Sequence, residues 1–219
     1  KLAIGVDIGG TNTAFGLVDD QGNMYGESVI STRQYPDFDQ YIEELYIGIQ
    51  SLLKQLDIEH ELIGVGIGAP NANYYRGTIE NAANLVWKGV VPVVEKLQRF
   101  FPSVPVIMTN DAKAAAVGEM VYGGAKGMKD FIVITLGTGL GSGFVANGQI
   151  IYGHDSFAGE LGHVIVNHTG RVCGCGRKGC LETYVSATGI KRTVFKLLAD
   201  HTENSEFRDV SFNDLTAEM

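Results

Sequence analysis

Apolar and small or polar side chains alternate near the start of the chain. Across residues 2–8 every second position is apolar, which is the period of a half-buried β-strand. Two glycines end this run. Two further strand-like runs, at 12–19 and 23–31, are joined by a turn at 19–22. The pattern therefore predicts a β-meander at the amino-terminal end.

The spacing of the apolar positions changes at Phe38. From there to Leu56 apolar side chains recur every three or four residues, which predicts an amphipathic helix. The other expected elements, in chain order, are a strand at 62–68, a polar loop at 71–91, a helix near 92–100, a strand near 104–109, an alanine-rich helix at 112–120, paired strands at 130–136 and 140–146, and an amphipathic helix near 186–200. Trp87, inside the expected loop, is interpreted as a core or interface residue.

Two parts of this order resemble each other. A strand pair with a Gly-Gly-Thr turn at 9–11 is matched later by a strand pair with a Gly-Thr-Gly turn at 137–139. We therefore expect a duplicated α/β fold with a cleft between its halves. The expected lobes are a small N-terminal lobe at 1–110 and a large lobe at 111–219.

Composition and charge narrow the class of protein. The chain has 219 residues, 45% of them hydrophobic, which suits a soluble protein with a sizeable core. A net charge of −8 argues against nucleic acid or an anionic membrane as the main partner, because both need a basic surface. The sequence shows no signal peptide and no apolar stretch of the roughly 20 residues that span a bilayer. We expect a cytoplasmic protein.

The two glycine turns are candidate phosphate-binding loops. Glycines let backbone N–H groups approach an anion closely. The first loop contains Asp7, Gly9, Gly10 and Thr11, and the second contains Gly137, Thr138 and Gly139. Asp7, at a strand end, can hold Mg²⁺ directly or through water. The alternative for the first loop is a plain β-turn, since glycine pairs are common in turns.

A polar pair closes the strand near 104–109 and opens the alanine-rich helix. Asp111 can be read as the N-cap of that helix, a role that aspartate fills well. It can also be a general base at a strand end, where ligands bind in α/β sheets. The two candidate phosphate loops favour the base, because phosphoryl transfer to a hydroxyl needs a carboxylate to accept the proton.

All three cysteines lie close together, in a glycine-rich polar loop. Cys173, Cys175 and Cys180 have the spacing of a zinc knuckle, and a histidine would complete a tetrahedral structural Zn²⁺ site. His163 is the first candidate for this ligand, although His168 and His154 remain open. The cysteines could instead be small buried hydrophobic residues, for which this polar loop is a poor setting. Two carboxylates bracket the segment, Glu160 and Glu182, and a zinc clamp would fix their positions.

The motifs together resemble the ROK family of sugar kinases and repressors, within the hexokinase and actin-like ATPase superfamily. The matching segments are Asp-Ile-Gly-Gly-Thr at 7–11, Gly-Ile-Gly-Ala-Pro at 66–70, Asn-Ala-Ala-Asn-Leu-Val-Trp at 81–87, Asn-Asp-Ala at 110–112, Gly-Thr-Gly at 137–139, Glu-Leu-Gly-His at 160–163 and Cys-Gly-Cys-Gly-Arg-Lys-Gly-Cys-Leu-Glu at 173–182. They span nearly the whole chain in the family's order. The cysteine and Glu-Leu-Gly-His segments are the most specific of them.

This resemblance implies a duplicated ribonuclease-H-like fold, with the zinc knuckle in the second lobe, and ATP-dependent phosphorylation of a hexose at its 6-hydroxyl, as in a glucokinase. Asp111 would be the base, and both glycine loops would hold the ATP phosphates and Mg²⁺. The implied sugar-binding residues are Asn84, Asn110, Asp111, Glu160, His163 and Glu182. His163 would bind zinc through one ring nitrogen and the sugar through the other. A homodimer or higher homo-oligomer is expected.

Other functions within the family stay open at this point. The substrate could be mannose or an N-acetylhexosamine, and the phosphoryl donor could be polyphosphate or ADP. The family also includes sugar-sensing transcriptional repressors. The chain could be such a repressor that has lost its DNA-binding domain.

The chain departs from the family pattern at two positions and in its length. It has Asn71 where glycine is common, and Lys113 where asparagine is common. We interpret Asn71 as a possible sugar contact and Lys113 as a surface change. Family members usually extend further, so we expect a truncated large lobe that lacks much of the adenine pocket.

Overall fold

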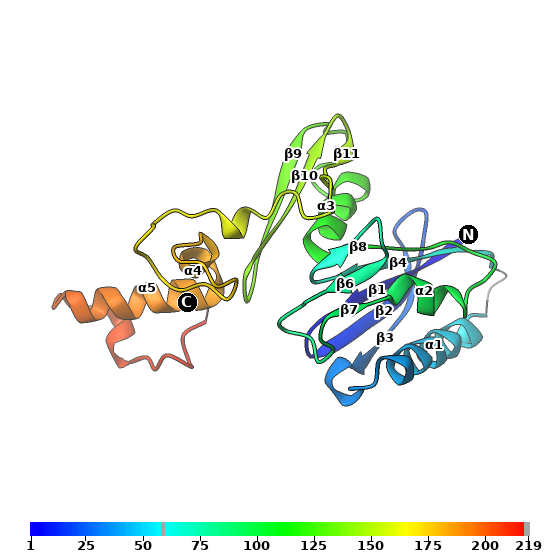
Figure 1. The fold of residues 1–219 in the computed structure, drawn as a ribbon, viewed down its shortest axis with the longest axis horizontal. Helices are drawn as coiled ribbons and strands as arrows, with labels where there is room; N and C mark the ends of the chain where they lie inside the picture. Colours follow the sequence, from blue (N-terminus) through cyan, green and yellow to red (C-terminus); the bar gives the residue numbers. More distant parts are fainter. Residues whose placement is uncertain (58–59, 217–219) are drawn as a thin grey trace. The chain divides into compact units, whose positions relative to one another are not determined.

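The computed structural model describes residues 1–57 and 60–216 (Figure 1). The described chain packs as two compact units. The first contains Lys1–Phe131 and Gly143–Ala158, and the second contains Ile132–Ser142 and Gly159–Met219. The expected lobe boundary after residue 110 stays a prediction. No helix in the described part of the chain is long and apolar enough to cross a membrane.

A five-stranded sheet forms the centre of the first unit, in the order β3-β2-β1-β4-β8. The strands are β1 (Leu2–Ile8), β2 (Asn12–Asp19), β3 (Met24–Ser31), β4 (Leu62–Ala69) and β8 (Val106–Asn110). The first three form the predicted antiparallel meander. Strands β1, β4 and β8 run parallel, so their carboxyl ends share one edge of the sheet. This confirms a mixed α/β architecture and places the turn after Ile8 and Asn110 at the same edge of the sheet, with the end of β4 between them.

Helices α1 (Phe38–Gln55) and α2 (Val93–Gln98) contribute to the hydrophobic core of this unit. Helix α1 begins where the Asp37 side chain accepts a hydrogen bond from the backbone N–H of Gln40. The apolar stripe predicted from the sequence is buried, as at Tyr41 and Ile49. Trp87 is also buried, and its indole N–H donates to the carbonyl of Tyr35 at 3.0 Å. Its interpretation as a core residue is confirmed.

The segment at 71–91, expected to be a polar loop, is mostly turns but also contains short strands that the sequence did not indicate. Three short strands, β5 (Ala72–Asn73), β6 (Thr78–Glu80) and β7 (Val90–Val91), form a second small sheet there. Strands of two or three residues are too short to show an alternation of apolar and polar side chains in the sequence. Asn71, just before β5, has a φ of 52°, a conformation in which glycine is the easiest residue and asparagine the next. Its amide nitrogen donates to the carbonyl of Glu80 at 3.0 Å, so Asn71 has a structural role in this sheet.

Helix α3 (Asp111–Val121) follows β8 directly and contacts β4 and β8. The interpretation of Lys113 as a surface change was wrong. Its side chain is only 1% exposed, and its ammonium group donates to the carbonyl of Ser156 at 3.1 Å. The position of Lys113 in the first turn of the helix does not indicate burial, because the segment that contacts it lies 43 residues away in the sequence.

The rest of the chain begins with a hairpin. Strands β9 (Phe131–Leu136), β10 (Leu140–Ala146) and β11 (Gln149–Ile150) form a sheet in the order β11-β10-β9. Irregular structure follows, with the 3-10 helix η2 (Leu161–His163), and then helices α4 (Glu182–Val185) and α5 (Ala187–Asp200). The hairpin and the last amphipathic helix agree with the sequence. The duplication of the fold stays a prediction.

Candidate functional site

The first glycine loop connects β1 to β2. The backbone N–H of Gly9 donates to the carbonyl of Asn12 at 2.9 Å, which closes the turn. A Cβ atom on Gly10 would lie 2.6 Å from the carbonyl oxygen of Asn84. Gly10 therefore has to be glycine for Asn84 to approach. The structure thus brings Gly10, which the sequence assigned to phosphate binding, against Asn84, which the resemblance assigned to sugar binding.

A buried network of hydroxyl groups supports this loop, and the sequence analysis missed it. The Thr13 hydroxyl lies 2.8 Å from the hydroxyls of both Thr32 and Tyr41. The backbone N–H of Thr32 donates to the carbonyl of Thr11, and the Arg33 side chain donates to the carbonyl of Gly10. Burial raises the pKa of the Tyr41 phenol above its usual range, which keeps it a hydrogen-bonding hydroxyl. Only the inward position of Thr13 in its strand hinted at this network.

Asn110 and Asp111 lie at the junction of β8 and α3. The Asn110 side chain is the N-cap, accepting from the backbone N–H groups of Ala112 at 3.0 Å and Lys113 at 3.4 Å. The alternative of Asp111 as N-cap was therefore wrong, because Asp111 is the first residue of the helix. Its exposed carboxylate also accepts from the N–H of Ala112, at 2.8 Å. The positive end of a helix favours a carboxylate at this position.

Asp7 and Asp111 line the same open cavity of about 920 Å³, on the face of the sheet that carries Asp7. Gly68 separates them: a Cβ atom there would lie 3.9 Å from an Asp7 carboxylate oxygen and 3.7 Å from the Asp111 Cα. Partial burial, and then the negative charge of Asp111, raise the pKa of Asp7 above its ordinary value of 3.8. A divalent cation would relieve this repulsion, and carboxylate oxygens are the ligands that Mg²⁺ prefers. The cavity therefore suits Mg²⁺.

Asp7→Asn should stabilise the fold slightly at neutral pH. A carboxyl group whose pKa is higher in the folded than in the unfolded state contributes to the free energy of unfolding. This contribution is fully present below pH 3.8 and is lost as the pH rises through the folded-state pKa. Asparagine does not titrate, so the variant's Tm should exceed that of the wild type by on the order of 1 °C, because solvent screens this exposed group. The difference should shrink as the pH falls toward 3.8.

Thermal unfolding followed by circular dichroism over a pH series measures this difference. Asp20→Asn, at an exposed carboxylate in the turn after β2, is the matched control and should show no gain. A lower Tm for Asp7→Asn at neutral pH would contradict the assigned repulsion.

The second glycine loop, between β9 and β10, lies against Glu182 within the second unit. The N–H of Gly137 donates to the carbonyl of Gly139 at 3.1 Å, and Thr138 at the tip is exposed. A Cβ atom on Gly139 would lie 2.8 Å from a Glu182 carboxylate oxygen. The same oxygen accepts from the N–H of Leu140 at 3.4 Å. The candidate sugar ligand Glu182 is thus fixed to the candidate phosphate loop.

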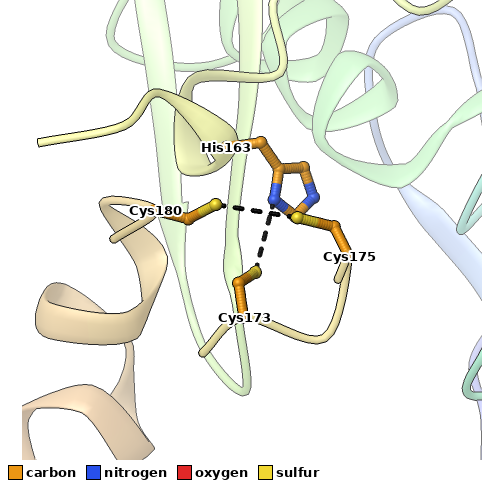
Figure 2. A group of neighbouring side chains, drawn as sticks. All are labelled: His163, Cys173, Cys175 and Cys180. Atoms are coloured by element: carbon orange, nitrogen blue, oxygen red, sulfur yellow. Dashed lines mark hydrogen bonds between the residues drawn. The ribbon is translucent and has the colours of Figure 1, made fainter. Parts of the chain in front are cut away.

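The three cysteines and one histidine converge in the second unit (Figure 2). The ligand atoms of His163, Cys173, Cys175 and Cys180 all lie within 4.8 Å of one another. Among the described residues neither His154 nor His168 joins this group, so His163 is the histidine that completes it. Three thiol sulfurs and one imidazole nitrogen are the donor set of a structural zinc site, and the cluster could hold that ion.

One thiol of this cluster already favours the thiolate form that binds a metal cation. A hydrogen bond with the Arg177 side chain is the main factor that lowers the pKa of the exposed Cys175 thiol, to about 6, which favours the thiolate that binds metals. Burial raises the pKa of Cys173 to about 12. A metal ion would compensate the cost of ionising such a buried thiol. Cys173 and Cys180 are buried and lie beside the start of α4.

Glu182 contacts the cluster through its carboxylate, and Glu160 contacts it through its backbone carbonyl. Glu182 lies 2.9 Å from the Cys173 sulfur and 3.7 Å from Nδ1 of His163. Glu160 directly precedes η2, and its carbonyl accepts from the N–H of His163 at 3.1 Å. The Ser142 hydroxyl donates to the carbonyl of Gly159 and accepts from the N–H of Leu161, the two residues that flank Glu160. The backbone of this turn is therefore well fixed, and the Glu160 side chain is exposed.

The family model described as ROK family matches residues 3–219. The chain belongs to the ROK family. A glucokinase from Streptomyces coelicolor is 40% identical to this ROK chain over 192 residues, which cover 87% of this chain and 58% of that enzyme. A crystal structure of a ROK family glucokinase from Streptomyces griseus, in complex with glucose and AMPPNP, superposes with a TM-score of 0.77 at 33% identity and covers 100% of this chain and 69% of that one.

Regulators are also related to this ROK chain. A xylose repressor from Caldicellulosiruptor bescii is 30% identical over 203 residues, which cover 92% of this chain and 50% of the repressor. The chain thus spans only part of the length of the relatives it matches.

Proposed function

We propose that the protein is an ATP-dependent hexose kinase that phosphorylates the 6-hydroxyl of glucose. The observation that carries this proposal is the cavity over one face of the five-stranded sheet, which Asp7, near the end of β1, and Asp111, just after β8, both line. One carboxylate suits a metal and the other suits a proton acceptor, and phosphoryl transfer to an alcohol needs both. The similarity to glucokinases supports the same reaction.

Asp111 would act as the general base. It would accept the proton of the sugar hydroxyl while the sugar oxygen attacks the γ-phosphorus of ATP in line. The new oxygen–phosphorus bond forms as the bond to the bridging oxygen of ADP breaks. Backbone N–H groups of the glycine loops, at 9–11 and 137–139, would stabilise the charge on the phosphoryl oxygens. Mg²⁺ held by Asp7 would neutralise charge on the phosphates.

The proposed sugar-binding side chains are Asn84, Asn110, Asp111, Glu160, His163 and Glu182. Zinc held by four protein ligands would supply a rigid clamp rather than an open coordination position. Through His163, and through the contact of Glu182 with Cys173, this clamp would fix two sugar ligands.

A sugar-sensing regulator is the second candidate, favoured by the similarity to a xylose repressor. Such a protein needs the sugar-binding residues and has no use for a base at the position of Asp111. The presence of Asp111 and of the complete Asp-Ile-Gly-Gly-Thr loop therefore favours the kinase. The cytoplasmic location and the homo-oligomer stay predictions.

A coupled ADP-release assay on the full-length polypeptide that carries this sequence tests the proposal. The sugars are glucose, mannose, fructose, N-acetylglucosamine and N-acetylmannosamine, each with MgATP. Formation of glucose phosphate is measured directly with polyphosphate or ADP as donor, because transfer from these donors releases no ADP. We expect the highest kcat/KM with glucose and MgATP. Preference for another sugar would correct the substrate. Calorimetric sugar binding without any turnover would support the regulator instead.

A further inference from the structure

Lys113 is a buried cation that the proposed reaction does not use. Its side chain is 1% exposed, and it lies in the first turn of α3, two residues after Asp111. An ammonium group is costly to remove from water unless hydrogen bonds compensate. The carbonyl of Ser156 accepts from it at 3.1 Å. Lys113 therefore ties the 152–158 loop to the helix that carries the proposed base.

The 152–158 loop is also tied to the 71–75 turn, which begins the second small sheet. The Ser156 hydroxyl accepts from the N–H of Tyr74 at 2.8 Å, and the Asn73 amide donates to the carbonyl of Asp155 at 3.3 Å. The Tyr75 hydroxyl donates to the carbonyl of Gly153 at 3.0 Å. These hydrogen bonds and the Lys113 contact fix the loop and the turn to each other and to α3.

This assembly ends in an aromatic wall of the proposed catalytic cavity. The rings of Tyr74 and Tyr152 stack with centroids 4.1 Å apart and planes at 13°. Both rings line the cavity that Asp7 and Asp111 also line. The position of the loop thus affects the cavity wall directly.

We propose that Lys113 is a positioning residue of the kinase, which holds the 152–158 loop and the Tyr74–Tyr152 wall in place beside Asp111. The inference rests on the proposed phosphorylation of a hexose. Lys113 acts through other residues and not on the substrate. A misplacement of about 1 Å at such a supporting position can cost up to about a hundredfold in rate.

The test compares three variants of the full-length protein, with kcat, the sugar KM and Tm measured for each. Lys113→Met removes the charge and keeps the length of the side chain. We expect kcat to fall about tenfold or more and the sugar KM to rise, together with a lower Tm. Ile49→Val, on the buried face of α1, is the control for lost stability: it should lower Tm without changing kcat or KM.

Ser156→Gly separates positioning from stability. Ser156 has a φ of 73°, which glycine adopts without strain, so the variant should fold with a Tm near that of the wild type. It removes the hydroxyl that accepts from Tyr74. We expect a kcat about threefold or more below the wild type, from a loosened wall. It keeps the Ser156 carbonyl that accepts from Lys113, so it tests the step from the loop to the aromatic wall and to kcat, even if Lys113→Met does not fold.

Unchanged kcat and KM in Ser156→Gly, and in Lys113→Met where it folds, would overturn the positioning role while wild-type turnover leaves the kinase proposal intact. A wild type that phosphorylates no sugar would overturn the proposed function itself, and this inference with it.

Discussion

Asp111→Asn is expected to lower kcat for glucose phosphorylation by about 10²–10⁴-fold, the usual contribution of a general base. Asparagine cannot accept the hydroxyl proton. Its side-chain oxygen can still accept from the N–H of Ala112, as the Asp111 carboxylate does at 2.8 Å. The helix start should therefore persist, since Asn110 provides the N-cap. Steady-state kinetics with the coupled ADP-release assay measure the loss.

Two further measurements make this result specific. Glucose binding by calorimetry should change little, because an amide can still hydrogen-bond a sugar hydroxyl. Asp130→Asn is a matched control, because the Asp130 carboxylate accepts from the backbone of Asn147 and does not line the cavity. It should keep wild-type kcat. Turnover near the wild-type level in Asp111→Asn would exclude Asp111 as the base.

The strands of the meander and the long helix could be predicted because each buries one face. Alternation over residues 2–8 and the three-four spacing after Phe38 are direct consequences of a sheet face and a helix stripe against one core. The glycine loops could be predicted for a related reason. A side chain at Gly10 would collide with Asn84, and one at Gly139 would collide with Glu182. The glycines in the sequence therefore indicate these close approaches.

Other features depend on contacts between distant segments and left no local pattern. The buried Lys113 ammonium donates to Ser156, and the Thr13 hydroxyl bonds Thr32 and Tyr41. The N-cap at Asn110 could not be distinguished from one at Asp111, because both residues cap helices equally well. The choice of His163 over His154 and His168 likewise needed the three-dimensional path of the chain.

Cys175→Ser should release the zinc ion that we propose for the second unit. The Cys175 side chain is exposed, so its replacement by the similarly shaped serine should disturb packing little. Cys173, Cys180 and His163 would then lack their fourth partner. With the clamp lost, Glu182 and His163 are free to move, and the Kd for glucose should rise about 10–100-fold. Metal analysis by atomic emission and calorimetric titration with glucose measure the two effects.

Lys178→Ser is the matched control, an exposed residue of the same loop that contributes no ligand atom to the cluster. It should retain zinc and wild-type affinity for glucose. Zinc content unchanged by Cys175→Ser would contradict the ligand assignment. Zinc lost with glucose affinity unchanged would retain the metal site but remove its role in sugar binding. Glu182 and His163 would then be held by their protein contacts, such as the N–H of Leu140 on Glu182, and the clamp would serve folding alone.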